Sequence, residues 1–367
     1  MRRRFAMTCF FIVASLTVTL TGRMQCFGVD QAIHIRPDGL VDPSTAPIVT
    51  ADNVTYCMTD DIYTTVSIER DNVVFNGANH SVQGTSAFGT NGIELNGRTN
   101  VTIMNVGIVE FWQGIYISES SHVIVNENLV TDHYNGMMIM SSSNCWIERN
   151  NVTSNYNDAI YFENCTNPMV LGNQIRGSDL TDHDYGITVN FSSNSTVRGN
   201  RIRDIEFGIG IQNSANNKVS ENDVSTVNQY ALWLASSANN TLWENNIMSN
   251  TIGVWLSSSS NNLFYNNNFV NNTFQVETGG TVSDWNGTYS IGGNYWSDYE
   301  GKDSSRGQFQ NQPGSDGFGD SPYIIDEKNQ DFYPLMNAVP EHISVAVATV
   351  FILSTLFLVV YRRRHSE

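Results

Sequence analysis

A repeat of about 22 residues is the feature that most limits how this chain can fold. Apolar residues follow a recurring small residue at one and at three positions, so each apolar pair is two residues apart. A two-residue period predicts strands, and stacked repeats would bury the apolar residues in one continuous core. The small residues are spaced by 22, 22, 23, 27, 22, 23 and 22 residues and are Gly92, Gly114, Gly136, Ala159, Gly186, Gly208, Ala231 and Gly253.

Asparagine recurs fourteen positions after the small residue in consecutive repeats. Its amide can hydrogen-bond to its own turn and to the equivalent Asn of the next repeat, so we expect a ladder of stacked side chains. The pattern predicts an all-β fold, a right-handed single-stranded parallel β-helix with coils of about 22 residues. A leucine-rich repeat has a similar period, but leucine is sparse and no helical pattern follows each strand. The predicted ladder residues are Asn128, Asn150, Asn173, Asn200, Asn222, Asn245 and Asn267.

The regular repeats span 92–272, and the segments around them differ in composition. We expect 27–91 to form an N-terminal cap and the first coils. Residues 273–336 are rich in Gly, Asp and aromatic residues, and we expect them to cap the last coil. Both ends of such a stack need covering, because an exposed strand edge pairs with other chains.

Both termini carry membrane signals. Three arginines precede an apolar run and predict a signal peptide in 1–26, with its cleavage left open. Residues 343–361 contain no charged residue and are long enough to cross a bilayer as a helix. The basic tail at 362–367 would lie in the cytoplasm. We therefore expect a single-pass protein of the cell membrane, with its body extracytoplasmic, on the cell surface or the periplasmic side.

The charge balance limits the partners. Asp and Glu number 36 against 19 Lys and Arg, which gives a net charge of −17 over 367 residues. Such a surface repels nucleic acid and anionic lipids, so we expect no nucleic acid partner. Outside the cytoplasm, Cys145 and Cys165 are free to form a disulfide, although the spacing does not require it. Ten Asn-x-Ser/Thr sites are compatible with a glycoprotein.

Several segments resemble the NosD-like parallel β-helix family. They are the Asn-rich coils 239–247 and 261–269 and the tail motifs 293–299, 316–326 and 331–336, and the resemblance extends over about 50–336. It implies a right-handed parallel β-helix of the carbohydrate-binding and sugar-hydrolysis type. The family's namesake resembles a periplasmic factor in copper-site maturation of nitrous oxide reductase. A fold by itself does not establish an activity.

Outward-facing aromatic residues predict a surface for sugar rings. The position two residues after the small residue lies between two inward positions, so its side chain points outward. Aromatic residues occupy it in four coils, as Tyr116, Tyr161, Trp233 and Trp255. They would either stack against sugar rings or stack on one another beneath the C-terminal segment.

Acidic residues in the turn before each small residue are candidates for catalysis. We expect Asp182 and Asp204 to stack from coil to coil, about 5 Å apart, with Asp158 on the other side, which suits a retaining glycosidase pair or a shared Ca²⁺ ion. A solvated acidic turn is the alternative. In the tail, Asp316, Asp320 and Asp326 are further Ca²⁺ candidates. The expected substrate-binding neighbours in the turns are Asp132, His133, His183, Asp184 and Glu206.

Three functions follow as alternatives. The first is a membrane-anchored extracytoplasmic protein that binds polysaccharide and, if it is an enzyme, acts as a polysaccharide hydrolase or lyase. The second is a non-catalytic surface scaffold or adhesin. The third, by family analogy, is copper-site maturation, since thioether and imidazole groups suit Cu(I). Its candidate ligands are Met137, Met138, Met140, His122 and His133.

Overall fold

The computed structural model describes residues 31–177 and 184–340. The predicted signal peptide, the membrane helix at 343–361, Asp182 and His183 lie outside these residues. The described residues form strands and turns and contain no helix. Accordingly, no helix within 31–177 or 184–340 has the length and apolar character needed to span a membrane.

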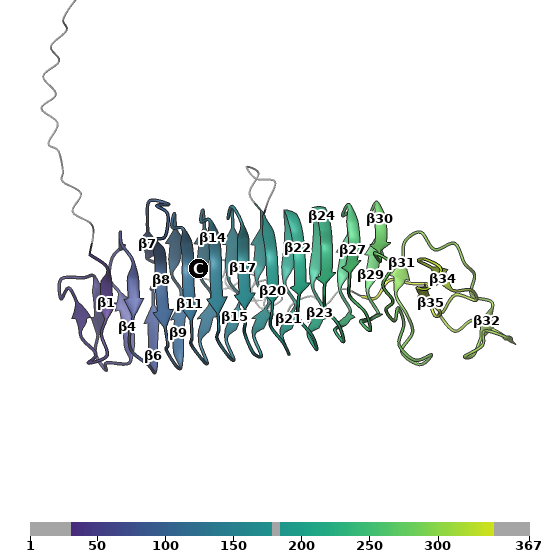
Figure 1. Ribbon diagram of the computed structural model, residues 1–367, viewed down its shortest axis with the longest axis horizontal. Coiled ribbons are helices and arrows are strands. Elements are labelled where there is room, and N and C mark those ends of the chain that lie inside the picture. Colours follow the sequence, from purple (N-terminus) through teal and green to yellow (C-terminus); the bar gives the residue numbers. More distant parts are fainter. Residues whose placement is uncertain (1–30, 178–183, 341–367) are drawn as a thin grey trace, which may run out of the picture. The chain divides into compact units, whose positions relative to one another are not determined.

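The described chain is a parallel β-helix of right-handed type with about ten turns (Figure 1). Each coil adds strands to a 20-stranded and an 11-stranded sheet. The first row of the larger sheet consists of β1 (Ile33–Ile35), β5 (Val66–Ile68), β8 (Asn91–Asn96), β11 (Gln113–Ser118), β14 (Asn135–Met140), β17 (Asp158–Glu163), β20 (Tyr185–Asn190), β22 (Arg201–Gln212), β24 (Asp223–Ala235), β27 (Ile252–Ser257) and β30 (Phe274–Glu277).

A second row of the same sheet follows each coil's outer turn, and β22 and β24 run through both rows. This row consists of β7 (Ser81–Gln83), β10 (Gly107–Val109), β13 (Leu129–Thr131), β16 (Asn151–Thr153), β19 (Gln174–Arg176), β26 (Asn246–Met248), β29 (Asn268–Val270) and β31 (Tyr295–Trp296), and β2 (Val41–Asp42) pairs with β1. The smaller sheet contains β3 (Ile48–Thr50), β4 (Thr55–Met58), β6 (Val73–Asn76), β9 (Val101–Met104), β12 (Ile124–Asn126), β15 (Trp146–Glu148), β18 (Met169–Leu171), β21 (Thr196–Arg198), β23 (Lys218–Ser220), β25 (Thr241–Trp243) and β28 (Leu263–Tyr265).

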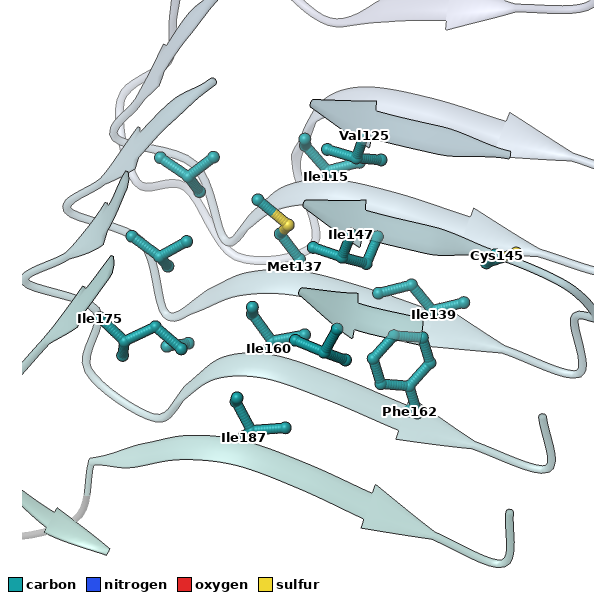
Figure 2. Close-up of a cluster of buried hydrophobic side chains, with 14 of the residues drawn as sticks. Ile115, Val125, Met137, Ile139, Cys145, Ile147, Ile160, Phe162, Ile175 and Ile187 are labelled. Atoms are coloured by element: carbon teal, nitrogen blue, oxygen red, sulfur yellow. The ribbon is translucent and has the colours of Figure 1, made fainter. Parts of the chain in front are cut away.

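The core is built from the apolar positions of the repeat, which confirms the all-β parallel β-helix prediction. Residues one position after the small residue face each other from coil to coil, as Ile115 does with Met137 and Met137 with Ile160. Figure 2 shows these side chains stacked inside the coils with Ile139 and Phe162 from the same strands. All of them are fully buried. The two-residue period therefore places every second side chain in one shared core.

The asparagines form a continuous ladder inside one turn of the coils. The Oδ1 atom of each Asn accepts hydrogen bonds from the backbone N–H and the side-chain amide of the Asn one coil earlier, as Asn150 does from Asn128, both at 3.0 Å. The Nδ2 atom also donates to a core strand, as Asn150 does to Val125 O at 2.9 Å. The ladder runs through all seven predicted positions to Asn294.

A second ladder of serines lies in the turn after the first-row strands, and Cys165 takes one of its positions. Its backbone N–H donates to Ser192 Oγ at 2.9 Å, as serines do in neighbouring coils. Cys145 and Cys165 are both buried and both free thiols. The disulfide that we considered is therefore not formed.

The C-terminal segment covers the end of the core. Trp285 stacks on Phe264 with a centroid distance of 4.3 Å, and Trp296 stacks on Phe269 at the same distance. Both indoles are buried, and their Nε1–H groups donate to Asn329 and to Asp331. The segment also contains two short antiparallel pairs, β32 (Ser305–Arg306) with β33 (Gln312–Pro313) and β34 (Tyr323–Ile324) with β35 (Gln330–Asp331).

The three tail carboxylates proposed for Ca²⁺ each accept hydrogen bonds from other residues of the C-terminal segment. Asp316 accepts from the Tyr289 hydroxyl at 2.7 Å, and Asp320 accepts from the Ser304 hydroxyl at 2.7 Å. Asp326 accepts from the Thr278 hydroxyl at 2.6 Å. These hydrogen bonds give each carboxylate a structural role in holding the C-terminal segment together.

Candidate functional site

The outward side chains of the first-row strands from β11 to β27 form a surface that we call the outer face. Three positions of each strand contribute, at one residue before and at two and four residues after the small residue. In β17 these are Asp158, Tyr161 and Glu163, and in β20 they are Tyr185, Thr188 and Asn190. The outer face therefore brings together residues that are 22 to 27 positions apart in sequence.

Asp158 is a carboxyl group with unusual burial for this surface. It is only 8% exposed. Its Oδ1 atom accepts from the Thr188 hydroxyl at 2.6 Å, and its Oδ2 atom accepts from the Asn157 amide at 3.0 Å. Burial raises the pKa of the Asp158 carboxyl to about 6, and the Thr188 bond offsets only part of that effect. A carboxyl group of this kind exchanges protons near neutral pH, as a general acid does.

Tyr161 lies between Asp158 and a second carboxylate. Its hydroxyl donates to Glu163 Oε2 at 3.3 Å and accepts from the Asn190 amide at 3.1 Å. Burial raises the pKa of the Tyr161 phenol, and the charges of Glu163 and Asp158 raise it further. The phenol therefore stays protonated and available as a hydrogen-bond donor.

An aromatic cluster borders Asp158 on the C-terminal side. Tyr185 stacks on Phe207 with a centroid distance of 4.5 Å, and Tyr230 stacks on Trp255 at 5.0 Å. Trp233 packs against both Tyr185 and Phe207. Sequence reasoning missed Tyr185, Phe207 and Tyr230, although an aromatic residue directly before the small residue in three successive coils is a visible signal.

The four predicted aromatics do not form one exposed line. Trp233 is 5% exposed, so its expected exposure is wrong. Its ring lies over Gly210, where an added Cβ would come within 2.0 Å of Trp233 Cζ2. Tyr116, Tyr161 and Trp255 are half-buried. The missing side chain at Gly210 thus leaves room for the indole of the next coil.

Of the expected row of carboxylates, Asp182 lies outside the described residues, and Asp158 and Asp204 do not share a row. Asp158 faces Tyr185 in the next coil, and Tyr185 faces Phe207, three residues beyond Asp204. Asp204 instead pairs with Arg176 at 3.0 Å. Asp158 stands one residue before the small residue of its coil and Asp204 four residues before its own, so the two carboxylates occupy different positions of the repeat.

Two of the turn residues expected to bind substrate point inward. His133 is 3% exposed and takes an Asn position in a turn ladder. Its Nδ1 atom accepts from the Phe111 N–H at 3.0 Å, and burial lowers its pKa to about 4. Asp184 is buried and accepts from the Glu206 N–H at 2.8 Å, whereas Asp132 is exposed. The prediction that His133 and Asp184 contact substrate is therefore wrong, because both side chains are buried.

The proposed copper ligands do not fit one site. Met137 is fully buried in the core and His133 is held in its turn, while Met138 and Met140 lie on the outer face. His122 lies on the smaller sheet's side. Within the described ranges, no three His, Cys, Asp or Glu side chains are close enough together to hold a metal ion. We therefore assign no metal chemistry to these residues.

Replacing Asp158 with asparagine should change how stability depends on pH. The folded carboxyl has a pKa of about 6, above its unfolded value of 3.8, so the folded protein binds the extra proton between these values. The free energy of unfolding of the parent should therefore fall as the pH rises through this window. Between pH 4 and pH 7, the free energy of unfolding of Asp158→Asn should fall by about 2–3 kcal/mol less than that of the parent, as measured by urea unfolding. Glu127→Gln removes an exposed carboxylate and should keep the parent's pH dependence; equal behaviour of Asp158→Asn and the parent would contradict the burial argument.

Solved structures share the fold at low sequence identity. The periplasmic alginate epimerase AlgG is 14% identical with a TM-score of 0.50, covering 69% of this chain and 71% of that chain. PfbA, a surface adhesin of Streptococcus pneumoniae, is 13% identical with a TM-score of 0.46, covering 59% and 71%. DFA-IIIase from Arthrobacter chlorophenolicus A6 is 15% identical with a TM-score of 0.45, covering 64% of this chain and 62% of that one, less than two thirds of its length.

These structures establish similarity of fold alone. A search of curated protein sequences finds no match to this chain. The family model described as "Periplasmic copper-binding protein (NosD)" matches residues 34–180 and 172–301, nearly all of the described coils. The NosD-like resemblance read from the Asn-rich coils and tail motifs is thereby confirmed, and the chain belongs to the NosD family.

Proposed function

We propose that this protein binds a polysaccharide along the outer face and that its body lies outside the cytoplasm, anchored to the membrane by residues 343–361. The observation that carries the proposal is the buried Asp158 carboxyl beside the aromatic cluster. Burying a carboxyl costs free energy, and Asp158 lies on the outward side, where the core does not need it. Groups with perturbed pKa values next to surface aromatics are typical of functional sites.

The outer face offers both kinds of contact that a sugar chain needs. Tyr161, Asn190 and Asp158 present hydrogen-bonding groups within two adjacent coils. The half-buried rings of Tyr230 and Trp255 supply apolar surface two and three coils beyond β20, and aromatic side chains with a polar group suit such mixed surfaces. A chain lying along the coils would contact both groups at once.

Asp158 is also the residue placed to act on a bound chain. A carboxyl with a pKa of about 6 is partly protonated near neutral pH and can donate a proton to a glycosidic oxygen. Because the described residues place no second carboxylate in the coil-to-coil row of Asp158, binding is the primary proposal. Proton donation by Asp158 is its catalytic extension, as a hydrolase or a lyase.

Incubation with polysaccharides tests the proposal. The full-length protein, solubilised in detergent, is mixed with acidic and neutral polysaccharides, and co-elution and polymer length are followed by size-exclusion chromatography. We expect co-elution with at least one polymer and about tenfold weaker binding by Tyr161→Ala, as expected for one aromatic contact. If the polymer is shortened, Asp158→Asn should slow shortening by about 100-fold or more.

The outcomes separate the candidate functions. Glu127→Gln, an exposed carboxylate paired with Arg149 on another turn, should behave like the parent. Co-elution without shortening would leave a binding protein. Absence of both effects with every polymer would contradict the proposal and favour a scaffold. Equal binding by Tyr161→Ala and the parent would show that the polysaccharide binds somewhere other than the outer face.

A further inference from the structure

A groove of about 600 Å³ lies on the outer surface of the smaller sheet, away from the residues of the outer face. Its floor is formed by successive strands β12, β15, β18 and β21, through Ile124, Trp146, Met169 and Thr196. Its rim is formed by the turn before those strands and consists of Asn100, His122, Asn144, Asn167 and Asn194. We call this feature the amide groove.

Among the described residues, the floor of the amide groove is the place where three successive residues of its column are apolar. The in-register column through the smaller sheet reads Thr55, Val74, Thr102, Ile124, Trp146, Met169, Thr196, Lys218, Thr241 and Leu263, so single apolar residues also occur outside the groove. Polar residues flank the three apolar ones, as expected for a sheet face in contact with water. Trp146 is 41% exposed. An apolar patch limited to three coils therefore has no explanation in the repeat itself.

The rim repeats one polar group per coil. Its residues have positive φ angles, for example 52° at Asn144 and 54° at Asn167, so the backbone favours Asn there. The amides also interact along the rim, since Asn167 Nδ2 donates to Asn144 Oδ1 at 3.2 Å. Successive coils are about 4.8 Å apart, similar to the length of one pyranose unit. The rim thus presents donors and acceptors at the repeat of a sugar chain.

The lining contains no Asp, Glu, Lys or Arg, in a chain with a net charge of −17. The negative charge of the whole chain disfavours acidic polymers, and the uncharged lining offers no ion pair to compensate. A peptide strand also fits poorly, because the groove lies on the face of a sheet whose backbone groups pair with neighbouring coils. Strand addition requires an open edge.

We propose that the amide groove binds a neutral polysaccharide chain, laid along the coils, as a second site beyond the outer face. The apolar floor packs against the non-polar faces of the sugar rings, and the rim amides exchange hydrogen bonds with their hydroxyl groups. This combination of an apolar surface with a few placed polar groups is that of ligand sites in general. The two sites use different residues, so each can fail without the other.

Binding of neutral polymers by groove variants tests the inference. The full-length protein is expressed in a host without N-glycosylation, which keeps Asn100 and Asn194 unmodified, and is titrated with soluble mannan, β-glucan and dextran in affinity electrophoresis. We expect at least one of them to bind. Trp146→Ala should then weaken that binding by about tenfold, and Asn144→Gly, which tolerates the positive φ angle, should weaken it by a few fold.

Matched controls decide the outcome. Trp243→Ala removes a half-buried Trp from β25 of the same sheet, outside the groove, and should bind like the parent. Circular dichroism verifies that each variant keeps its β-structure. Tyr161→Ala reports on the outer face, so a loss there with groove binding intact separates the two sites. Equal binding by Trp146→Ala, Asn144→Gly and the parent, or no binding of any neutral polymer, overturns the inference.

Discussion

Replacing Asn200 with alanine should lower the free energy of unfolding by about 3–5 kcal/mol, because it removes one step of the buried Asn ladder. Asn200 Oδ1 accepts from the backbone N–H of Asn173 at 2.9 Å and from the Asn173 amide at 3.0 Å. Its own amide donates to Val170 O at 2.9 Å. Alanine leaves the Asn173 N–H and the Val170 carbonyl without these partners, and each buried unpaired group costs about 1–3 kcal/mol. The measurement is the urea midpoint of the full-length protein.

Replacing an Asn outside the ladder tests whether the destabilisation comes from the ladder hydrogen bonds or from the loss of any Asn. Asn151 is exposed on β16, one residue after a ladder position, and Asn151→Ala should change stability by less than about 0.5 kcal/mol. Similar destabilisation by Asn200→Ala and Asn151→Ala would mean that the ladder bonds contribute little beyond what water would offer. Because coils interact mainly with their neighbours, we also expect Asn200→Ala to weaken the middle of the helix more than its ends, which hydrogen exchange can resolve.

Replacing Trp296 with alanine should cost about 3–5 kcal/mol and cause the protein to self-associate. Trp296 stacks between Phe269 of the last coils and Tyr323 of the capping segment, with centroid distances of 4.3 and 4.2 Å. Its Nε1–H donates to Asp331 Oδ2 at 2.9 Å. Without the indole, Phe269 loses its stacked neighbour, the buried Asp331 carboxyl loses one of its hydrogen-bond donors, and the end of the core is exposed. Thermal unfolding and light scattering of the full-length protein measure the two effects.

The control for the cap is an aromatic residue of the same segment that covers nothing. Phe309 is 79% exposed, so Phe309→Ala should leave both the midpoint and the particle size unchanged. A Trp296→Ala protein with the parent's midpoint and particle size would show that the C-terminal segment does not protect the solenoid end. A lowered midpoint without association would retain the packing argument and reject the role of the cap against edge pairing.

The fold could be predicted because each coil repeats the same local rules. The apolar pairs two residues apart predict that the side chains of Ile115, Met137 and Ile160 are buried and stack in register. The ladder positions were also visible, since a buried amide needs the same partner in every coil. The coils then stack in the one register that gives every buried amide its hydrogen-bond partner, whatever residues occupy the other positions.

The candidate sites could be predicted only in part. The sequence places Tyr161 on the outward side and Asp158 in the turn before its strand, but it does not show that the Thr188 hydroxyl binds the Asp158 carboxyl. It missed Trp146, because one exposed Trp in a repeat carries no periodic signal. It also assigned His133 to the surface, whereas the structure uses that ring in place of a ladder amide.

The coil, the ladder and the family can all be recognised from the sequence alone, because they depend on contacts that recur between equivalent positions. The three-dimensional structure was needed to show that Thr188 binds Asp158, that Trp233 lies over Gly210 and where the amide groove opens. Those features depend on unlike residues in neighbouring coils, and the lengths of the turns set their register.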